Sequence, residues 1–242
     1  MKFLPFLFLL IACACNSESI PPPKPVKVKP GNLEFFEVYS FTELAEVWNS
    51  VFIQSAKTDT LPRYMDLTKE QFQSRRLENL VSFAPDSTYY FVKEKDLPAV
   101  DSILAIPEIK NRFPKDLEFM WSYCLETNKD SLKGRYLYAI KIPKGKIARI
   151  DGRYVNSANL ELHGGRHNRS YINLTMTIDG TVEWEKMTED NLGHCIAITM
   201  DHKVIICPRV NCSIQSGTAG IEGNFSLKEL EELTARINSG RR

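Results

Sequence analysis

Residues 188–207 read TEDNLGHCIAITMDHKVIIC, and they belong to the most informative third of the chain. Two apolar runs, at residues 195–200 and 203–207, are separated by the dipeptide Asp201-His202. Apolar runs of this length around two polar residues predict an antiparallel hairpin, although histidine is a poorer second turn residue than glycine.

The residues that flank the hairpin alternate between strand and helix patterns. Residues 170–178 predict a strand and Asp179-Gly180 a turn. A helix is expected over residues 181–192, and Gly193 should end it because glycine readily takes the left-handed conformation there. Downstream, residues 213–221 should form a bent strand or a loop.

Two further helices are predicted from capping boxes, in which a serine caps the helix and a glutamate three residues later reaches back. Ser226 and Glu229 begin the last helix, and Gly240 ends it. Its predicted core stripe is Leu227, Leu230, Leu233 and Ile237. Ser40 and Glu43 begin a helix over residues 41–56. Its predicted core residues are Leu44, Trp48, Val51 and Phe52.

The remaining elements complete a mixed pattern. Strands are expected over residues 33–39, 88–92, 117–125 and 136–142, with a polar turn at 127–134 between the last two. Helices are expected over residues 69–81 and 97–110. This order predicts an α+β fold with mixed or antiparallel sheets and helices packed on one face.

Composition excludes some classes of protein. The chain has 31 basic and 30 acidic residues, so its net charge of +1 gives no field for nucleic acid. A hydrophobic content of 43% is ordinary for a packed protein. The residues after position 31 suffice for one large domain or two small ones.

The N-terminal segment predicts export. Lys2 precedes an apolar run over residues 3–12, which is shorter than the roughly 20 residues of a membrane-spanning helix. Leu10-Ile11-Ala12-Cys13 resembles a bacterial lipobox, so residues 1–12 are interpreted as a signal peptide and Cys13 as the lipidated residue. An ordinary signal cut after Ala14 is the alternative, and Cys15 leaves the cut open. We expect a lipid-anchored protein of the cell envelope that faces the periplasm from either membrane.

Residues 13–31 are rich in proline and lysine. Proline fixes the backbone, so this segment should be an extended, semi-rigid tether. It is expected to be a solvated linker rather than a lipid-headgroup contact.

The cysteines do not form a metal-binding pattern. Cys124, Cys195, Cys207 and Cys212 lie in the expected mature domain without a Cys-x-x-Cys spacing. Structural, mostly buried thiols are expected. An exported protein can form disulfides, but a Cys207–Cys212 bridge would have to close a very short loop.

Residues 163–169, HGGRHNR, are the only dense polar cluster. They could bind an anion or a metal, but a surface loop is the better interpretation because no carboxylate or cysteine with ligand spacing accompanies them. A hydrolase using His163 or His167 is disfavoured, since no nucleophile motif or triad appears. Residues 213–220 lack the ending of a phosphate loop. We therefore expect a protein without enzymatic activity, cofactor or bound metal.

The order of motifs in the last third resembles the head subdomain of the first periplasmic domain of SecD and fused SecDF proteins. The residues that carry this resemblance are 188–198, 201–205, 208–211, 221–226 and 229–230. Residues 33–39, 104–110 and 113–117 resemble the same family's base region, as in Bacteroidota-like bacteria. The resemblance implies a base-like part over residues 32–146 and a head-like part over residues 147–242.

The resemblance implies a role in protein export. A lipid anchor would replace the family's first membrane helix, so we expect a stand-alone lipoprotein without the proton pathway of the membrane helices. It should be an accessory module that binds unfolded or translocating polypeptides, or Sec translocon components, by strand addition near residues 207–223 or the hairpin tip. The expected contact residues are Arg209, Asn211, Gln215, Thr218 and Asn224. The alternative is a structural or interaction lipoprotein that kept the fold without an export role.

Overall fold

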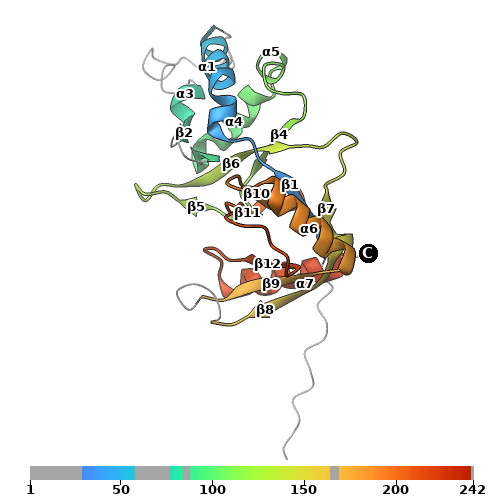
Figure 1. Cartoon of the computed structure of the whole chain (residues 1–242). Coiled ribbons are helices and arrows are strands. Elements are labelled where there is room, and N and C mark those ends of the chain that lie inside the picture. The colour runs from blue at the N-terminus through green and yellow to red at the C-terminus, as the bar shows by residue number, and fades with distance from the viewer. Residues whose placement is uncertain (1–28, 58–76, 84–87, 164–168, 241–242) are drawn as a thin grey trace, which may run out of the picture.

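The computed structural model describes residues 29–57, 77–83, 88–163 and 169–240. Its elements follow the chain as β1 (Leu33–Glu37), α1 (Phe41–Lys57), α3 (Leu77–Leu80), β2 (Val81–Phe83), β3 (Tyr89–Lys93), η1 (Glu94–Asp96), α4 (Leu97–Leu104), α5 (Pro107–Lys110), β4 (Leu117–Trp121), β5 (Glu126–Thr127), β6 (Lys133–Lys141), β7 (Ile150–Asp151), η2 (Gly152–Tyr154), β8 (Val155–Glu161), β9 (Tyr171–Met176), α6 (Ile178–Asp190), β10 (Ile196–Met200), β11 (Lys203–Ile206), β12 (Thr218–Ile221) and α7 (Leu227–Gly240). They form three antiparallel sheets with helices, as expected for an α+β fold (Figure 1).

The central sheet has the strand order β11-β10-β1-β7. Strand β1 pairs with β10 in the register Leu33↔Met200, so the start of the domain lies beside the predicted hairpin. Leu33 and Phe35 point into one core, and Phe36 points into another on the opposite face. Successive residues of a strand alternate between faces, so β1 helps to form both cores. It comes from the base-like segment but shares a sheet with strands of the head-like segment.

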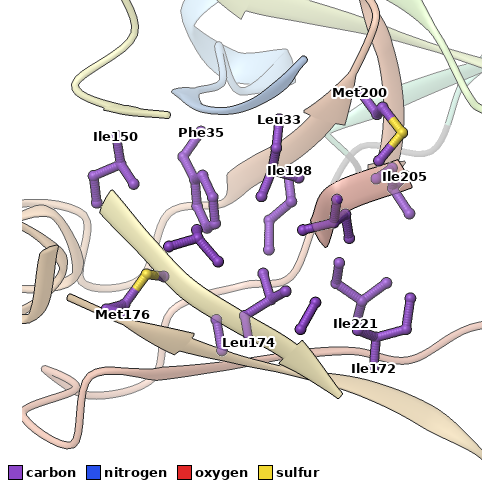
Figure 2. Close-up of a cluster of buried hydrophobic side chains, with 14 of the residues drawn as sticks. Leu33, Phe35, Ile150, Ile172, Leu174, Met176, Ile198, Met200, Ile205 and Ile221 are labelled. Carbon is purple, nitrogen blue, oxygen red and sulfur yellow. The ribbon is translucent and has the colours of Figure 1, made fainter. Parts of the chain in front are cut away.

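One core lies between the central sheet and the three-stranded sheet β12-β9-β8 (Figure 2). Leu174 and Ile172 of β9 face Phe35 and Ile198 of the central sheet. Helices α6 and α7 close this core with Trp184, Met187, Leu230, Leu233 and Ile237.

A second core lies between the sheet β2-β3-β6-β4 and four helices, α1, α3, α4 and α5, which cover one of its faces (Figure 1). Its centre is Trp48, which is 1% exposed. The opposite face of this sheet packs on the central sheet through Met120, Tyr138, Ile140, Ala197 and Val204.

Both predicted capping boxes are present. The backbone N–H of Ser40 donates to the Glu43 carboxylate at 2.7 Å, and the Glu43 N–H donates to Ser40 Oγ at 3.3 Å. Ser226 and Glu229 form the same pair, at 2.8 and 3.3 Å. The local sequence therefore fixes where α1 and α7 begin.

The hairpin between β10 and β11 is also confirmed. Asp201 and His202 both have positive φ, 49° and 59°, as a two-residue turn of this type requires. The Asp201 carboxylate accepts from the Asn32 N–H at 2.9 Å and from the Arg236 guanidinium. One turn residue therefore ties together the chain start, the hairpin and α7.

Three expectations about helices were wrong. The helix expected over 97–110 is divided into α4 and α5, because Pro107 lacks the N–H that a continuous helix needs and instead occupies the first turn of α5. Asp179-Gly180 is not a turn but the first turn of α6, which Thr177 caps through a hydrogen bond from the Gly180 N–H at 3.0 Å. Leu227 is 49% exposed, since it lies on the outer side of the first turn of α7.

Three boundaries differ as well. The polar turn expected at 127–134 is shorter, because β5 pairs with the start of β6. The strand expected over 117–125 ends at Trp121. Of the helix expected over 69–81, residues 69–76 lie outside the described part, and Val81 belongs to β2.

The Asp201 contacts predict how stability depends on pH. Burial raises the pKa of this carboxyl, but the hydrogen bond from the Asn32 N–H and the Arg236 charge outweigh burial and lower it. The pKa of Asp201 is lower in the folded protein than in the unfolded chain, where it is about 3.9, so the ionised carboxylate stabilises the fold at pH values above 3.9. This contribution is lost as the pH falls through the lower pKa of the folded state. Asp201→Asn keeps a residue that tolerates positive φ, and it should lower the free energy of unfolding by about 1 kcal/mol at pH 7 because the pair is partly exposed. Urea unfolding should show that the difference from wild type shrinks toward zero at about pH 2; a constant difference would exclude the ionic contribution.

Candidate functional site

The five expected contact residues lie on the surface of the head-like part. Arg209, Asn211, Gln215 and Asn224 are exposed, and Thr218 is half-buried. Arg209 donates to the Gly193 carbonyl at 2.8 Å, and Asn224 accepts from Arg169 at 3.0 Å. Among the described residues, no hydrogen bond joins one of these five to another. They therefore outline a surface that runs from the end of α6 to the start of α7, and not a single pocket.

Strand β12 is an edge strand of its sheet and lies in this surface. The Gly217 carbonyl accepts from the Met176 N–H on β9, so Thr218 and Gly220 direct their backbone groups away from β9. The indole N–H of Trp184 donates to the Thr218 carbonyl at 3.0 Å. Helix α6 thus covers the first half of the edge, and the exposed Gly220 remains open.

A cavity of about 300 Å³ lies at the start of α7. Asn224, Phe225, Leu227 and Leu230 form one side of it, and His163, Arg169 and Ser170 at the ends of β8 and β9 form the other. The predicted polar loop therefore begins and ends at this cavity, while its residues 164–168 lie outside the described part of the chain.

A larger groove lies in the base-like part, where the sequence singled out no site. It has a volume of about 780 Å³ and follows β4. Strand β4 is an edge strand of the sheet β2-β3-β6-β4, one face of which is covered by helices. Apolar side chains from the end of α4, the segment after α5, β4 and the residue after β6 line it: Leu104, Ala105, Phe113, Pro114, Leu117, Phe119 and Ile142. Its polar lining consists of three lysines, two carboxylates and one amide: Lys110, Lys115, Lys146, Asp116, Glu118 and Asn111.

The edge of β4 carries open backbone groups beside this groove. The Ile142 N–H donates to the Asp116 carbonyl, and the Ser122 N–H donates to the Tyr136 carbonyl. The backbone groups of the even-numbered residues of β4 therefore point toward β6. Leu117 and Phe119 therefore point their backbone groups outward. The Leu117 N–H bonds to Pro114, which leaves the Leu117 carbonyl and both groups of Phe119 unpaired among the described residues. Beyond Trp121 the edge is occupied, because Ser122 bridges Val204 of β11.

The two carboxylates of the groove have partners outside its lining. The Tyr39 hydroxyl donates to Asp116 at 2.8 Å, and burial with this carboxylate raises the pKa of Tyr39 to about 12. Glu118 lies 3.9 Å from the imidazole of His202 at the hairpin tip. Among the described residues, no salt bridge engages the three lysines of the lining, so the groove presents three ammonium groups beside the carboxylates of Asp116 and Glu118.

The cysteines are less uniformly buried than expected. Cys195 is buried, Cys124 and Cys207 are half-buried, and Cys212 is exposed; all four are free thiols. Burial and the neighbouring Glu229 carboxylate raise the pKa of Cys124 to about 12, which disfavours the thiolate form at neutral pH. The Cys207–Cys212 bridge is not formed.

The described residues also bear on metal binding and on membrane-spanning helices. In the described residues, no cluster of three or more His, Cys, Asp or Glu side chains has the arrangement of a metal site. The same residues contain no helix that is long and apolar enough to cross a membrane. The lipobox, Cys13 and most of the tether lie outside the described part.

Comparison with known proteins agrees with the resemblance seen in the sequence. Residues 133–241 match the family described as SecDF, P1 head subdomain. The chain is 29% identical over 145 residues to the protein translocase subunit SecD of Rhodothermus marinus, which covers 60% of the chain and 22% of that protein. It is 35% identical over 72 residues to SecDF of Thermus thermophilus, covering 30% of the chain and 10% of that protein.

Solved structures of SecDF are also similar over most of the chain. One, described as a membrane component SecDF that enhances protein export, covers 86% of this chain and 94% of its own at 18% identity and a TM-score of 0.38. SecDF from Thermus thermophilus covers 92% of this chain and 32% of its own, at 19% identity and a TM-score of 0.34.

The chain spans between 10% and 30% of the length of the curated SecD and SecDF relatives compared, the upper value being for SecD of Borreliella burgdorferi. The matched region contains the hairpin, α6, β12 and α7, which carry the resemblance to the head subdomain. Residues 33–39, 104–110 and 113–117, which resemble the base region, lie outside it. This chain is thus similar to the periplasmic domain of the protein-export components SecD and SecDF, through its P1 head subdomain.

Proposed function

We propose that this protein is a non-enzymatic module of the cell envelope that binds extended polypeptide segments during protein export. The open edge of β4 beside the 780 Å³ groove carries the proposal, because unpaired backbone groups at a sheet edge accept an extended chain. Similarity to SecD and SecDF supports the export setting. Attachment through a lipid on Cys13 and contact with the Sec translocon belong to the same proposal.

In this binding mode a client strand pairs with Leu117 and Phe119. The Phe119 N–H and carbonyl and the Leu117 carbonyl offer three hydrogen bonds that do not depend on client sequence. Alternate client side chains enter the apolar part of the groove near Leu104 and Phe113. The others face the solvent and the lysines. The groove should therefore prefer segments that alternate apolar with polar or acidic residues.

The short edge predicts weak binding. Each hydrogen bond contributes only about 0.5–1.5 kcal/mol net, and the β11 end limits how far the client strand can extend. Weak, sequence-tolerant contact suits a chain that must be released after export.

The head surface around β12 is the second candidate site. It contains the expected contact residues, and the exposed Gly220 leaves room for an approaching backbone. Helix α6 covers part of this edge through Trp184, so it offers fewer open groups than β4. The alternative function, a structural or interaction lipoprotein, would instead use a folded partner.

Binding of an unfolded exported polypeptide by the purified protein tests the proposal, with the same polypeptide folded as the comparison. Ala105→Trp fills the groove from an exposed position and should weaken binding to the unfolded polypeptide at least about tenfold, a change of about 1.4 kcal/mol. Glu108→Trp is the matched control, because Glu108 is exposed on the adjacent α5 and does not line the groove.

The outcomes separate the candidates. Loss of binding in Gln215→Trp with Ala105→Trp unaffected would move the site to the head surface. Equal binding of the folded and unfolded polypeptides, or no binding to either, would reject the function and favour the interaction lipoprotein.

A further inference from the structure

Two cysteines from neighbouring strands lie side by side between the central sheet and the sheet that contains β6. Cys195 stands directly before β10 and bridges Arg209, while Cys207 follows β11 directly. In this antiparallel register the two residues are diagonal neighbours on one face of the central sheet. Each thiol shifts the pKa of the other through a side-chain interaction, which requires the two sulfur atoms to lie close together.

The surroundings of the pair differ from those of the other cysteines. Thr88, directly before β3, lies beside both thiols and lowers the pKa of each. The hydrogen bond from Cys207 lowers the pKa of Cys195 to about 6, against the effect of burial and with help from Thr88, Arg209 and His194. The pKa of Cys207 is raised, because its proton is held by Cys195 and its sulfur is buried. One thiolate and one neighbouring thiol are the two partners that disulfide formation needs.

We propose that Cys195 and Cys207 form a redox-active pair that is oxidised to a disulfide by exchange with a disulfide-bearing oxidant. The Cys195 thiolate attacks one sulfur of the oxidant, and a mixed disulfide forms as the first thiolate leaves. Cys207 then loses its proton and attacks the Cys195 sulfur, which releases the second thiolate. The protein loses two hydrogen atoms, and the oxidant is reduced to two thiols.

This disulfide would connect β10 to the beginning of the segment that leads to β12. Cys207 directly precedes residues 208–217, which contain three of the expected contact residues. Closing the bond would hold the start of that segment against the central sheet. The inference stands independently of polypeptide binding, since it depends only on the position of the two thiols.

The test is to incubate the full chain with the small disulfide cystamine at pH 7 and map every cysteine by peptide mass spectrometry. A Cys195–Cys207 linked peptide should form, and dithiothreitol should reverse it. In Cys207→Ser, which lacks the second thiol, Cys195 should stop at the cystamine mixed disulfide. In Cys195→Ser, Cys207 should react more slowly than Cys195 does in Cys207→Ser.

The exposed Cys212 supplies the internal control, because it should form only a mixed disulfide in all three proteins. Cys195 and Cys207 both remaining free after Cys212 is fully modified would overturn the proposal. A Cys207–Cys212 linkage in the wild-type protein would overturn it as well.

Discussion

Trp48→Ala is expected to lower the free energy of unfolding by about 3–5 kcal/mol, since a large buried aromatic side chain leaves a cavity when it is truncated. Trp48 is 1% exposed, and its ring lies 4.8–5.8 Å from four other rings, those of Phe52, Tyr90, Phe113 and Phe119. The indole N–H also donates to the Tyr90 hydroxyl at 2.7 Å.

Urea unfolding followed by circular dichroism measures this loss. Trp48→Phe keeps an aromatic ring but removes the hydrogen bond, so a smaller loss is expected. Ile53→Ala, on the same helix and 59% exposed, should stay within about 0.5 kcal/mol of wild type. A loss below about 1 kcal/mol for Trp48→Ala would show that this aromatic cluster does not stabilise the base-like part.

Gly180→Ala should have the second largest effect, a loss of about 2–3 kcal/mol. A Cβ at position 180 would overlap the Tyr154 carbonyl, which is backbone and cannot rotate away. Either α6 must move off η2 or its first turn must unwind, and Trp184 would shift with it.

Gly220→Ala is the matched control for this substitution. A Cβ there would meet Tyr171 at 3.7 Å, which is ordinary contact, so its unfolding free energy should change by less than about 0.5 kcal/mol. The same urea titration measures both variants. Similar losses of unfolding free energy would show that replacing a glycine is destabilising in general, and that the close approach of α6 to Tyr154 is not the cause.

The sequence predicted those elements whose signals are local. Capping boxes located the starts of α1 and α7, and Asp201-His202 located the hairpin, because each depends on contacts within a few residues. The interpretation of Asp179-Gly180 failed for the opposite reason. Gly180 is required by the Tyr154 carbonyl, a contact that no local pattern reveals.

The candidate sites show the same limit. The head surface was predicted from a resemblance, whereas the groove along β4 depends on which strand is left at a sheet edge. Nothing in the residues of β4 distinguishes an edge strand from a central one. The contact between Cys195 and Cys207 likewise follows from the register of β10 and β11. The sequence contained both cysteines but gave no reason to pair them.

Amide hydrogen exchange at β4 tests the proposed function most directly. The Phe119 N–H points to the open edge, whereas the Met120 N–H points to β6, so in the free protein Phe119 should exchange much faster than Met120. Addition of an unfolded exported polypeptide at saturating concentration should slow exchange at Phe119 and leave Met120 unchanged. Saturated binding with unchanged exchange at Phe119 would contradict strand addition at this edge.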